Sequence, residues 1–357
     1  MIHRSNTFMI GLLLSASWLM VGCSSIDDDL SDCPVDGPKA TVDYELKLVT
    51  NMTTELTTQL TTQTDVQLSN ALKQYLNDVF TDFAHDVDLS FYDTVGDSIL
   101  LQKDEHIMDA NQASYSLNLP MRQYMHLAAA NVVDNELVDV MYDNRCHRSM
   151  IDQVIRDTID SHTTGIFTAR QPMEVLGNVS QNFNVHLYMA NCAATLVIDP
   201  NNYGSIDDVR VYSTGFATGF SICDSVFHYD SQAPIVRTSM IKSDGVNERA
   251  FCSVTFPSPE PSQAANTRTI IETEEPFIAE PSDEVLWEFR VYVPMKGNTR
   301  SEDSITETIL PLKVPLRAGE LKVIKCRIGD QGEIIPENPE IGTSVTLNWQ
   351  SGLVIDT

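Results

Sequence analysis

Hydrophobic and polar residues alternate along most of this chain, which is the pattern of half-buried β-strands. The first such run is Thr41 to Val49, where Val42, Tyr44, Leu46 and Leu48 share one face. Runs of the same kind predict further strands at 87–92, 98–101, 113–119, 125–133, 183–189, 193–198, 208–212, 250–256, 287–293, 310–314, 321–328 and 345–349. The pattern therefore predicts an all-β protein.

One stretch departs from this period. Between residues 65 and 83, apolar side chains recur at spacings of three and four, at Leu68, Leu72, Tyr75, Leu76, Val79, Phe80 and Phe83. This predicts an amphipathic helix with Thr64 or Asp65 as its N-cap. We expect the helix to pack on its own domain and not on a membrane, because its polar face is acidic. A second, short helix is predicted within 150–160.

The length of the chain allows two domains. With 357 residues and 42% hydrophobic content, the chain can fill two cores of ordinary size. The strand pattern favours an N-terminal β-sandwich at 41–180, with the helix as a minor insertion, and a C-terminal β-sandwich at 181–357.

The start of the chain has the features of a bacterial lipoprotein export signal. Arg4 precedes an apolar run at 8–22, and Gly22 stands just before Cys23. The run is shorter than the roughly 20 residues that span a bilayer, and an ordinary secretory site needs no cysteine. We expect 1–22 to be removed, Cys23 to be lipidated, and 23–40 to form an acidic tether. Met20 replaces the usual leucine, and the alternatives are an ordinary cleaved signal or a stray apolar helix.

The net charge of −27 restricts the classes of partner that the chain can bind. Phosphates of a nucleic acid would repel such a chain, so we expect no nucleic-acid partner. Anionic lipid headgroups would repel it too. Acyl chains on Cys23 are therefore the expected contact with the outer membrane, where two or more chains anchor stably.

Six further cysteines stand at 33, 146, 192, 223, 252 and 326. Export permits disulfides, and six cysteines allow fifteen pairings that the sequence does not rank. Cys192 and Cys326 lie inside strand-like runs, where a buried free thiol is common. The sequence leaves two alternatives open: free thiols, or disulfides among Cys33, Cys146, Cys192, Cys223, Cys252 and Cys326.

No catalytic, metal or cofactor site is predicted. The chain lacks the usual serine-nucleophile, zinc-protease and phosphate-loop motifs. Asp199, Asn201 and Tyr203 begin like a calcium loop, but the twelfth position is Arg210 and not a bidentate Glu, so we expect a turn there. The pairs His85–Asp86 and Cys146–His147 are neighbours that would point to opposite faces of a strand. An acidic glycosidase pair stays open, because the fold sets such partners.

Several of these features occur together in a known family. Cys23, the segment Ile26-Asp-Asp-Asp-Leu-Ser-Asp-Cys-Pro34, the first strand, and Val87-Asp-Leu-Ser-Phe-Tyr-Asp-Thr-Val-Gly96 resemble the opening of FimB-type anchor subunits of type V fimbriae. The run from Asn182 to Met189 is similar to the opening strand of that family's second sandwich. The helix at 65–83 departs from the family pattern.

The resemblance implies two transthyretin-like β-sandwich domains in tandem and a surface-exposed lipoprotein that anchors a pilus and ends its polymerisation. In such a system a neighbour's strand completes an open sandwich. We expect this subunit to keep its own first strand and to donate Val345, Leu347 and Trp349 to fimbrial stalk subunits. An intramolecular edge strand is the alternative for 345–349. The rival function is a surface glycan-binding lipoprotein of a polysaccharide-uptake system.

Overall fold

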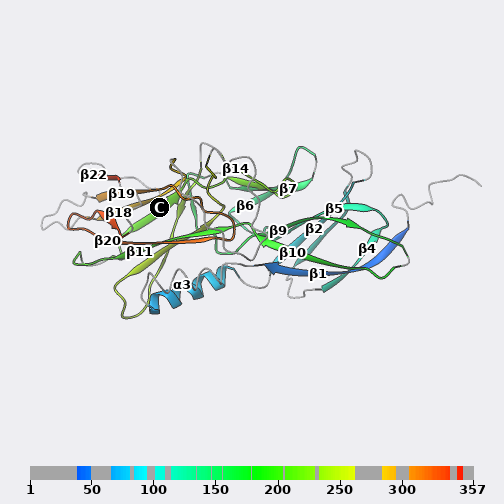
Figure 1. Ribbon diagram of the computed structural model, residues 1–357, viewed down its shortest axis with the longest axis horizontal. Helices are drawn as coiled ribbons and strands as arrows, with labels where there is room; N and C mark the ends of the chain where they lie inside the picture. Colours follow the sequence, from blue (N-terminus) through cyan, green and yellow to red (C-terminus); the bar gives the residue numbers. More distant parts are fainter. Residues whose placement is uncertain are drawn as a thin grey trace, which may run out of the picture.

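The computed structural model describes fourteen stretches of the chain: 38–49, 66–80, 84–94, 101–108, 114–133, 135–145, 147–154, 156–177, 179–203, 206–229, 233–261, 284–294, 305–337 and 344–348. These stretches form an elongated molecule built from four β-sheets and one helix (Figure 1). The prediction of an all-β sandwich fold with a minor helical insertion is confirmed.

A seven-stranded sheet occupies one end of the molecule (Figure 1). Its order is β3 (Leu101–Met108), β2 (Asp86–Asp93), β5 (Gln123–Ala130), β9 (Phe167–Glu174), β10 (Asn182–Met189), β1 (Lys39–Val49) and β4 (Ser114–Pro120). Only the β1–β10 pair is parallel. Side chains of β1 and β5 meet in one core although β9 and β10 lie between them, so the sheet curls around that core.

The other end is a sandwich of two sheets. One has the order β16 (Ser239–Ile241), β17 (Arg249–Thr255), β11 (Cys192–Asp199), β20 (Leu321–Ile328) and β21 (Ile334–Pro336). The facing sheet has the order β22 (Ser344–Asn348), β19 (Ile305–Leu312), β18 (Trp287–Pro294), β12 (Arg210–Thr214), β15 (Ile235–Arg237) and β8 (Thr158–Asp160). Alternate residues of β11, β18 and β20 fill the space between them, as expected for packed sheets.

A fourth sheet covers the middle of the molecule. It contains β14 (Val226–His228), β13 (Gly219–Ser221), β7 (Arg148–Gln153) and β6 (Val138–Tyr142), in that order. Phe220 and Ile151 of this sheet share a core with Tyr92 and Leu127 on the outer face of the seven-stranded sheet. The two outer strands come from the two halves of the chain, so this sheet ties the halves together.

The helix α3 (Val66–Val79) confirms the helical period at 65–83 and ends at Val79. Leu68, Leu72 and Leu76 are buried, as the spacing predicted. The helix covers the outer face of β16 and β17, and Tyr75 donates a hydrogen bond to Ser239 over 3.1 Å. It therefore packs mainly on a sheet formed by residues after 190, and Gly165 of the first half donates its backbone N–H to the carbonyl of Val79 at the end of the helix. Among the described residues, no helix is long and apolar enough to cross a membrane.

Two expectations about local structure are wrong. Residues 150–160 contribute to β7 and β8 and form no helix, because the burial of 148–153 alternates with the two-residue period of a strand and β7 pairs with both β6 and β13. The run at 183–189 does not open a second sandwich. It forms β10, which lies beside β1 in the seven-stranded sheet.

Candidate functional site

The first strand lies inside the seven-stranded sheet, with a hydrogen-bonded neighbour on each side. Tyr44 pairs with Phe183 of the parallel strand β10 and with Tyr115 of the antiparallel strand β4. Val42 and Tyr44 are 1% and 0% exposed. Burying each such side chain contributes about 1.5–3 kcal/mol. The position between β10 and β4 is therefore occupied by the chain's own β1.

A polar contact also fixes β1 to the opposite wall of the core. The Tyr44 hydroxyl donates to Nε2 of His126 on β5. The backbone carbonyl of Ser90 accepts from Nδ1 of the same ring over 3.1 Å. Since a carbonyl can only accept, Nδ1 carries the proton and Nε2 is the acceptor. Burial lowers the pKa of His126 to about 4, so the ring is neutral at pH 7.

The predicted donor strand lies at the far end of the molecule from β1 (Figure 1). Val345 pairs with Thr308 and Leu347 with Thr306, both on β19 of the same chain. The alternative of an intramolecular edge strand therefore describes β22 in this structure. Trp349 and Cys23 lie outside the described residues. Whether the three candidate donors act in a partner stays a prediction.

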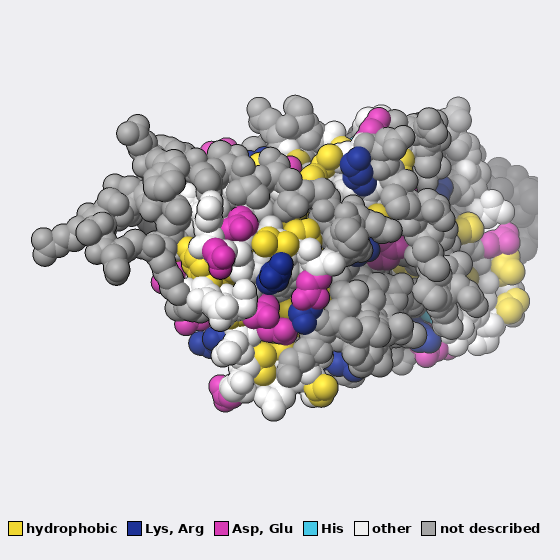
Figure 2. Space-filling view, turned by 60° about the vertical axis from the view of Figure 1, so that its left-hand side comes forward, with side chains coloured by type: hydrophobic (Ala, Val, Ile, Leu, Met, Phe, Trp, Pro, Cys, Tyr) yellow, Lys and Arg dark blue, Asp and Glu magenta, His cyan; other side chains and the backbone are white. Residues whose placement is uncertain are grey.

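The surface of this far end is charged with both signs. Figure 2 shows basic side chains beside acidic ones, with small hydrophobic areas between them. Lys325 and Glu248 pair at 3.1 Å, and Arg290 and Glu288 at 2.6 Å. Ion pairs at such a surface contribute little stability. Among the described residues of this face, basic and acidic side chains alternate, and the basic ones form no single area.

Four cysteines belong to the described part of the chain, and all four are free and buried: Cys192, Cys223, Cys252 and Cys326. Burial raises the pKa of Cys252 to about 12, so its thiol stays protonated and unreactive at pH 7. The expectation of buried thiols in strand-like runs is confirmed for Cys192 and Cys326. Cys33 and Cys146 lie outside the described residues.

The residues that begin like a calcium loop form a turn after β11. The Asp199 carboxylate accepts the backbone N–H of Asn201 over 2.8 Å, and Tyr203 donates its hydroxyl to the carbonyl of Pro294. The aspartate therefore stabilises the local backbone, as in an ordinary Asx turn. The interpretation of this segment as a turn is confirmed.

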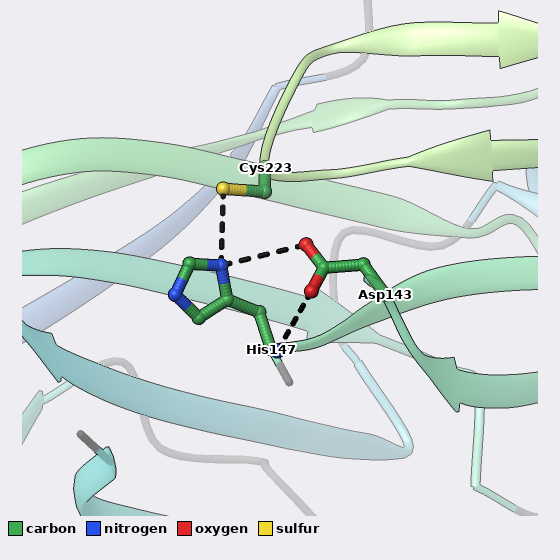
Figure 3. A group of neighbouring side chains, drawn as sticks. All are labelled: Asp143, His147 and Cys223. Atoms are coloured by element: carbon green, nitrogen blue, oxygen red, sulfur yellow. Dashed lines mark hydrogen bonds and ion pairs between the residues drawn. The ribbon is translucent and has the colours of Figure 1, made fainter. Parts of the chain in front are cut away.

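Tertiary structure brings together one group that the sequence pattern missed. Asp143, His147 and Cys223 converge between the β6–β7 turn and the turn after β13 (Figure 3). Nδ1 of His147 is 3.4 Å from Oδ2 of Asp143 and 3.4 Å from Sγ of Cys223. The spacing of Asp143 and His147 was the only local signal. Cys223 is 76 positions from His147, so no sequence window contains all three.

Comparison with known proteins yields likenesses of structure alone. No family model matches the chain, and no curated protein matches its sequence. A candidate adhesin from Bacteroides ovatus is similar over 89% of this chain and 97% of its own, with 10% identity and a TM-score of 0.48. A candidate polysaccharide-binding protein from Bacteroides thetaiotaomicron is similar over 84% of this chain and 99% of its own, with 8% identity and a TM-score of 0.47.

A fimbrial anchor protein from Porphyromonas gingivalis is similar over 87% of this chain and 99% of its own, with 9% identity and a TM-score of 0.44. These values describe a general likeness of chain path. The chain is thus similar in outline to a candidate adhesin, a candidate polysaccharide-binding protein and a fimbrial anchor protein, at sequence identities of 8–10%.

Proposed function

We propose that this protein is a non-enzymatic subunit of a fimbrial or adhesion system, of the FimB type, that anchors a fimbria to the outer membrane and ends its polymerisation. The observation that carries the proposal is the position of β1. An anchor must not accept a further strand at its membrane end, and here the chain's own β1 fills that position between β10 and β4.

The sequence before β1 also supports the proposal that the end of the molecule with β1 is the end at the membrane. Lipid on Cys23 would hold the start of the chain at the bilayer, and only a short acidic tether separates Cys23 from Lys39. A strand that follows a fixed anchor cannot be exchanged for a neighbour's strand without leaving its own core. Its buried Val42 and Tyr44 oppose that exchange.

The opposite end would couple to the stalk. β22 has one hydrogen-bonded neighbour, β19, within the described part of the chain. An edge strand with a single neighbour is held by fewer backbone bonds than β1. We propose that β22 leaves this edge and that Val345, Leu347 and Trp349 enter the groove of a stalk subunit, with main-chain bonds providing affinity and alternate side chains specificity.

The rival function, glycan binding, needs exposed aromatic rings on which sugars can stack. Trp287 is 2% exposed and donates its indole N–H to the carbonyl of Val314 over 3.0 Å. Its ring contacts Phe216 and Phe289 inside the sandwich. It therefore belongs to the core, and nothing about it favours a sugar platform.

The first test is a pull-down from detergent-solubilised outer membranes, with the wild type and Cys23→Ala compared. We expect stalk subunits to copurify with the wild type and to appear in the medium with the variant. Copurification of glycan-uptake components, without filament subunits, would support the rival function.

The second test concerns the coupling end. Deleting 343–357 is expected to release fimbriae while the lipoprotein stays folded in the membrane. Replacing Val345 and Leu347 with Lys should have the same effect, because charged side chains cannot enter apolar pockets. Thr346→Lys alters the other face of the strand and is the matched control. Fimbriae retained on cells that carry the deletion would contradict strand donation.

A further inference from the structure

The cluster of Asp143, His147 and Cys223 joins two turns that lie far apart in the chain. Asp143 follows β6 and His147 precedes β7, while Cys223 lies between β13 and β14. The backbone N–H of Asp143 donates to the carbonyl of His147 over 2.7 Å, which closes the first turn. In the second turn Ser225 has a φ of 54°, a left-handed conformation that non-glycine residues seldom adopt. Both turns are thus held in defined shapes.

The three side chains are almost shut off from solvent. Cys223 is 0% exposed, and the side chains of His147 and Asp143 are 8% and 5% exposed. The His147 ring lies against Tyr92, with ring centroids 4.1 Å apart. The Cys223 thiol also contacts Sδ of Met125 at 3.3 Å. Packing therefore fixes the direction of the donor atoms before any ligand arrives.

The geometry is not that of a catalytic triad. In a Cys–His–Asp triad the base faces the nucleophile with one ring nitrogen and the carboxylate with the other. Here Nδ1 of His147 faces both Asp143 and Cys223. One nitrogen cannot take a proton from the thiol while it donates a proton to the carboxylate. The arrangement cannot relay a proton, but it does aim three donors at one point.

The spacing fits a tetrahedral metal ion. Zinc bonds of about 2.0–2.2 Å to nitrogen and oxygen and about 2.3 Å to sulfur place neighbouring ligand atoms about 3.3–3.6 Å apart. Both distances from Nδ1 are 3.4 Å, and all three donor atoms lie within 4.8 Å of one another. An imidazole, a thiolate and a carboxylate are all zinc ligands. The carboxylate makes the set less suitable for Cu(I), which prefers softer donors.

Surrounding groups hold the carboxylate in place. Oδ1 of Asp143 accepts the backbone N–H groups of Arg145 and His147, each over 2.8 Å, and Oδ2 accepts the Ser149 hydroxyl over 3.0 Å. The Arg145 guanidinium also contacts Oδ2 at 3.3 Å and pairs with Asp224 at 2.9 Å. Such partners orient a metal ligand, and Asp224 balances the charge of Arg145 beside the site.

Protonation favours two of the three ligands. Burial lowers the pKa of His147, which leaves the ring neutral at pH 7. Burial raises the pKa of Asp143, but hydrogen bonds from the backbone of His147 and Arg145 outweigh that and lower it overall. Burial raises the pKa of Cys223, so the thiol is protonated.

We propose that Asp143, His147 and Cys223 supply three of the four ligands of a tetrahedral zinc site, with the fourth position open to water, and that the ion fastens the β6–β7 turn to the β13–β14 turn. This site is independent of the anchoring role, since it lies between the two ends of the molecule. The ion would cross-link the middle sheet, whose strands come from both halves of the chain.

The test uses the full-length, detergent-solubilised protein after removal of metal with a chelator under reducing conditions. Co²⁺ serves as the spectroscopic probe, because a cobalt–thiolate bond gives a charge-transfer absorption. We expect one Co²⁺ per chain with that absorption, and its loss when Zn²⁺ is added.

Variants should separate the ligands from their surroundings. Cys223→Ser and His147→Gln are expected to abolish the cobalt absorption and to weaken Zn²⁺ binding by about a hundredfold or more, since loss of an outer partner alone costs 10–100-fold. Cys326→Ser is the control, because Cys326 is an equally buried thiol in another sheet. An absorption that survives Cys223→Ser would overturn the proposal.

A measurement on the wild type covers the case in which those variants fail to fold. X-ray absorption at the zinc edge should show one sulfur at about 2.3 Å and nitrogen or oxygen at about 2.0–2.2 Å. A shell without sulfur, or no bound zinc after equilibration and desalting, would overturn the proposal.

Discussion

The hydroxyl of Tyr44 donates a hydrogen bond to Nε2 of His126, across the core of the curled seven-stranded sheet. Phe91 stacks on the His126 ring with centroids 4.4 Å apart and planes 10° apart. Tyr44 belongs to the first strand and His126 to β5, two strands that share no backbone bonds. The first strand is therefore held by its neighbours in the sheet and by one buried polar contact to the opposite wall.

Tyr44→Phe should destabilise the folded protein by about 1–2 kcal/mol. The substitution keeps the ring and its packing but leaves Nε2 of His126 buried without its donor. Chemical unfolding at pH 7, followed by circular dichroism, measures the change.

Tyr142→Phe is the matched control, since Tyr142 is 63% exposed. Its removal of a hydroxyl should change the free energy of unfolding by less than about 0.5 kcal/mol. Equal changes in the free energy of unfolding at both positions would show that the Tyr44 hydrogen bond stabilises the protein no more than an exposed hydroxyl does.

The protein should lose stability as the pH falls from about 6.5 to about 4. Burial lowers the pKa values of His126 and His162 to about 4 in the folded state, against about 6.5 in the unfolded chain. Between these values the unfolded state binds more protons, so acid favours unfolding. At pH 4.5 each ring should account for a loss on the order of 2–3 kcal/mol relative to pH 7.

Urea unfolding at a series of pH values measures how the free energy of unfolding depends on pH. His162→Leu should reduce the loss between pH 7 and 4.5, because the variant has one buried titrating ring fewer. His228→Gln is the control, since His228 is exposed. A His162→Leu variant with the same pH slope as the wild type would contradict the assignment.

Leu72→Ala should destabilise the protein by about 2–5 kcal/mol, the usual cost of such a cavity in a core. Leu72 is 1% exposed on the face of α3 that covers β16 and β17. The loss should appear as faster hydrogen exchange in β17 as well as in the helix, because the helix shields that sheet.

Gln74→Ala lies on the exposed side of the same helix and should change stability by less than about 0.5 kcal/mol. If hydrogen exchange in β17 is unchanged in Leu72→Ala, the helix and the sheet behind it do not open together.

The local sequence pattern was enough to predict the strands and the helix that bury only one face. The alternation in β1 and β18 and the helical period of α3 all appear in the burial of these elements, because side-chain direction follows directly from the backbone repeat. The short strands β8, β13 and β15 were missed, because three residues carry no measurable period. The apparent helix at 150–160 failed because pairing with β6 and β13 decided that segment.

The sequence by itself determined the strand-rich fold class, the position of the helix and the acidic charge. Each of these depends on residues close together in the chain. Tertiary structure alone decided that β10 lies beside β1, that α3 covers the second sandwich, and that Cys223 meets His147. These contacts join residues that are far apart in sequence, and the pairing of strands and the burial of sheet faces, which no local pattern contains, bring them together.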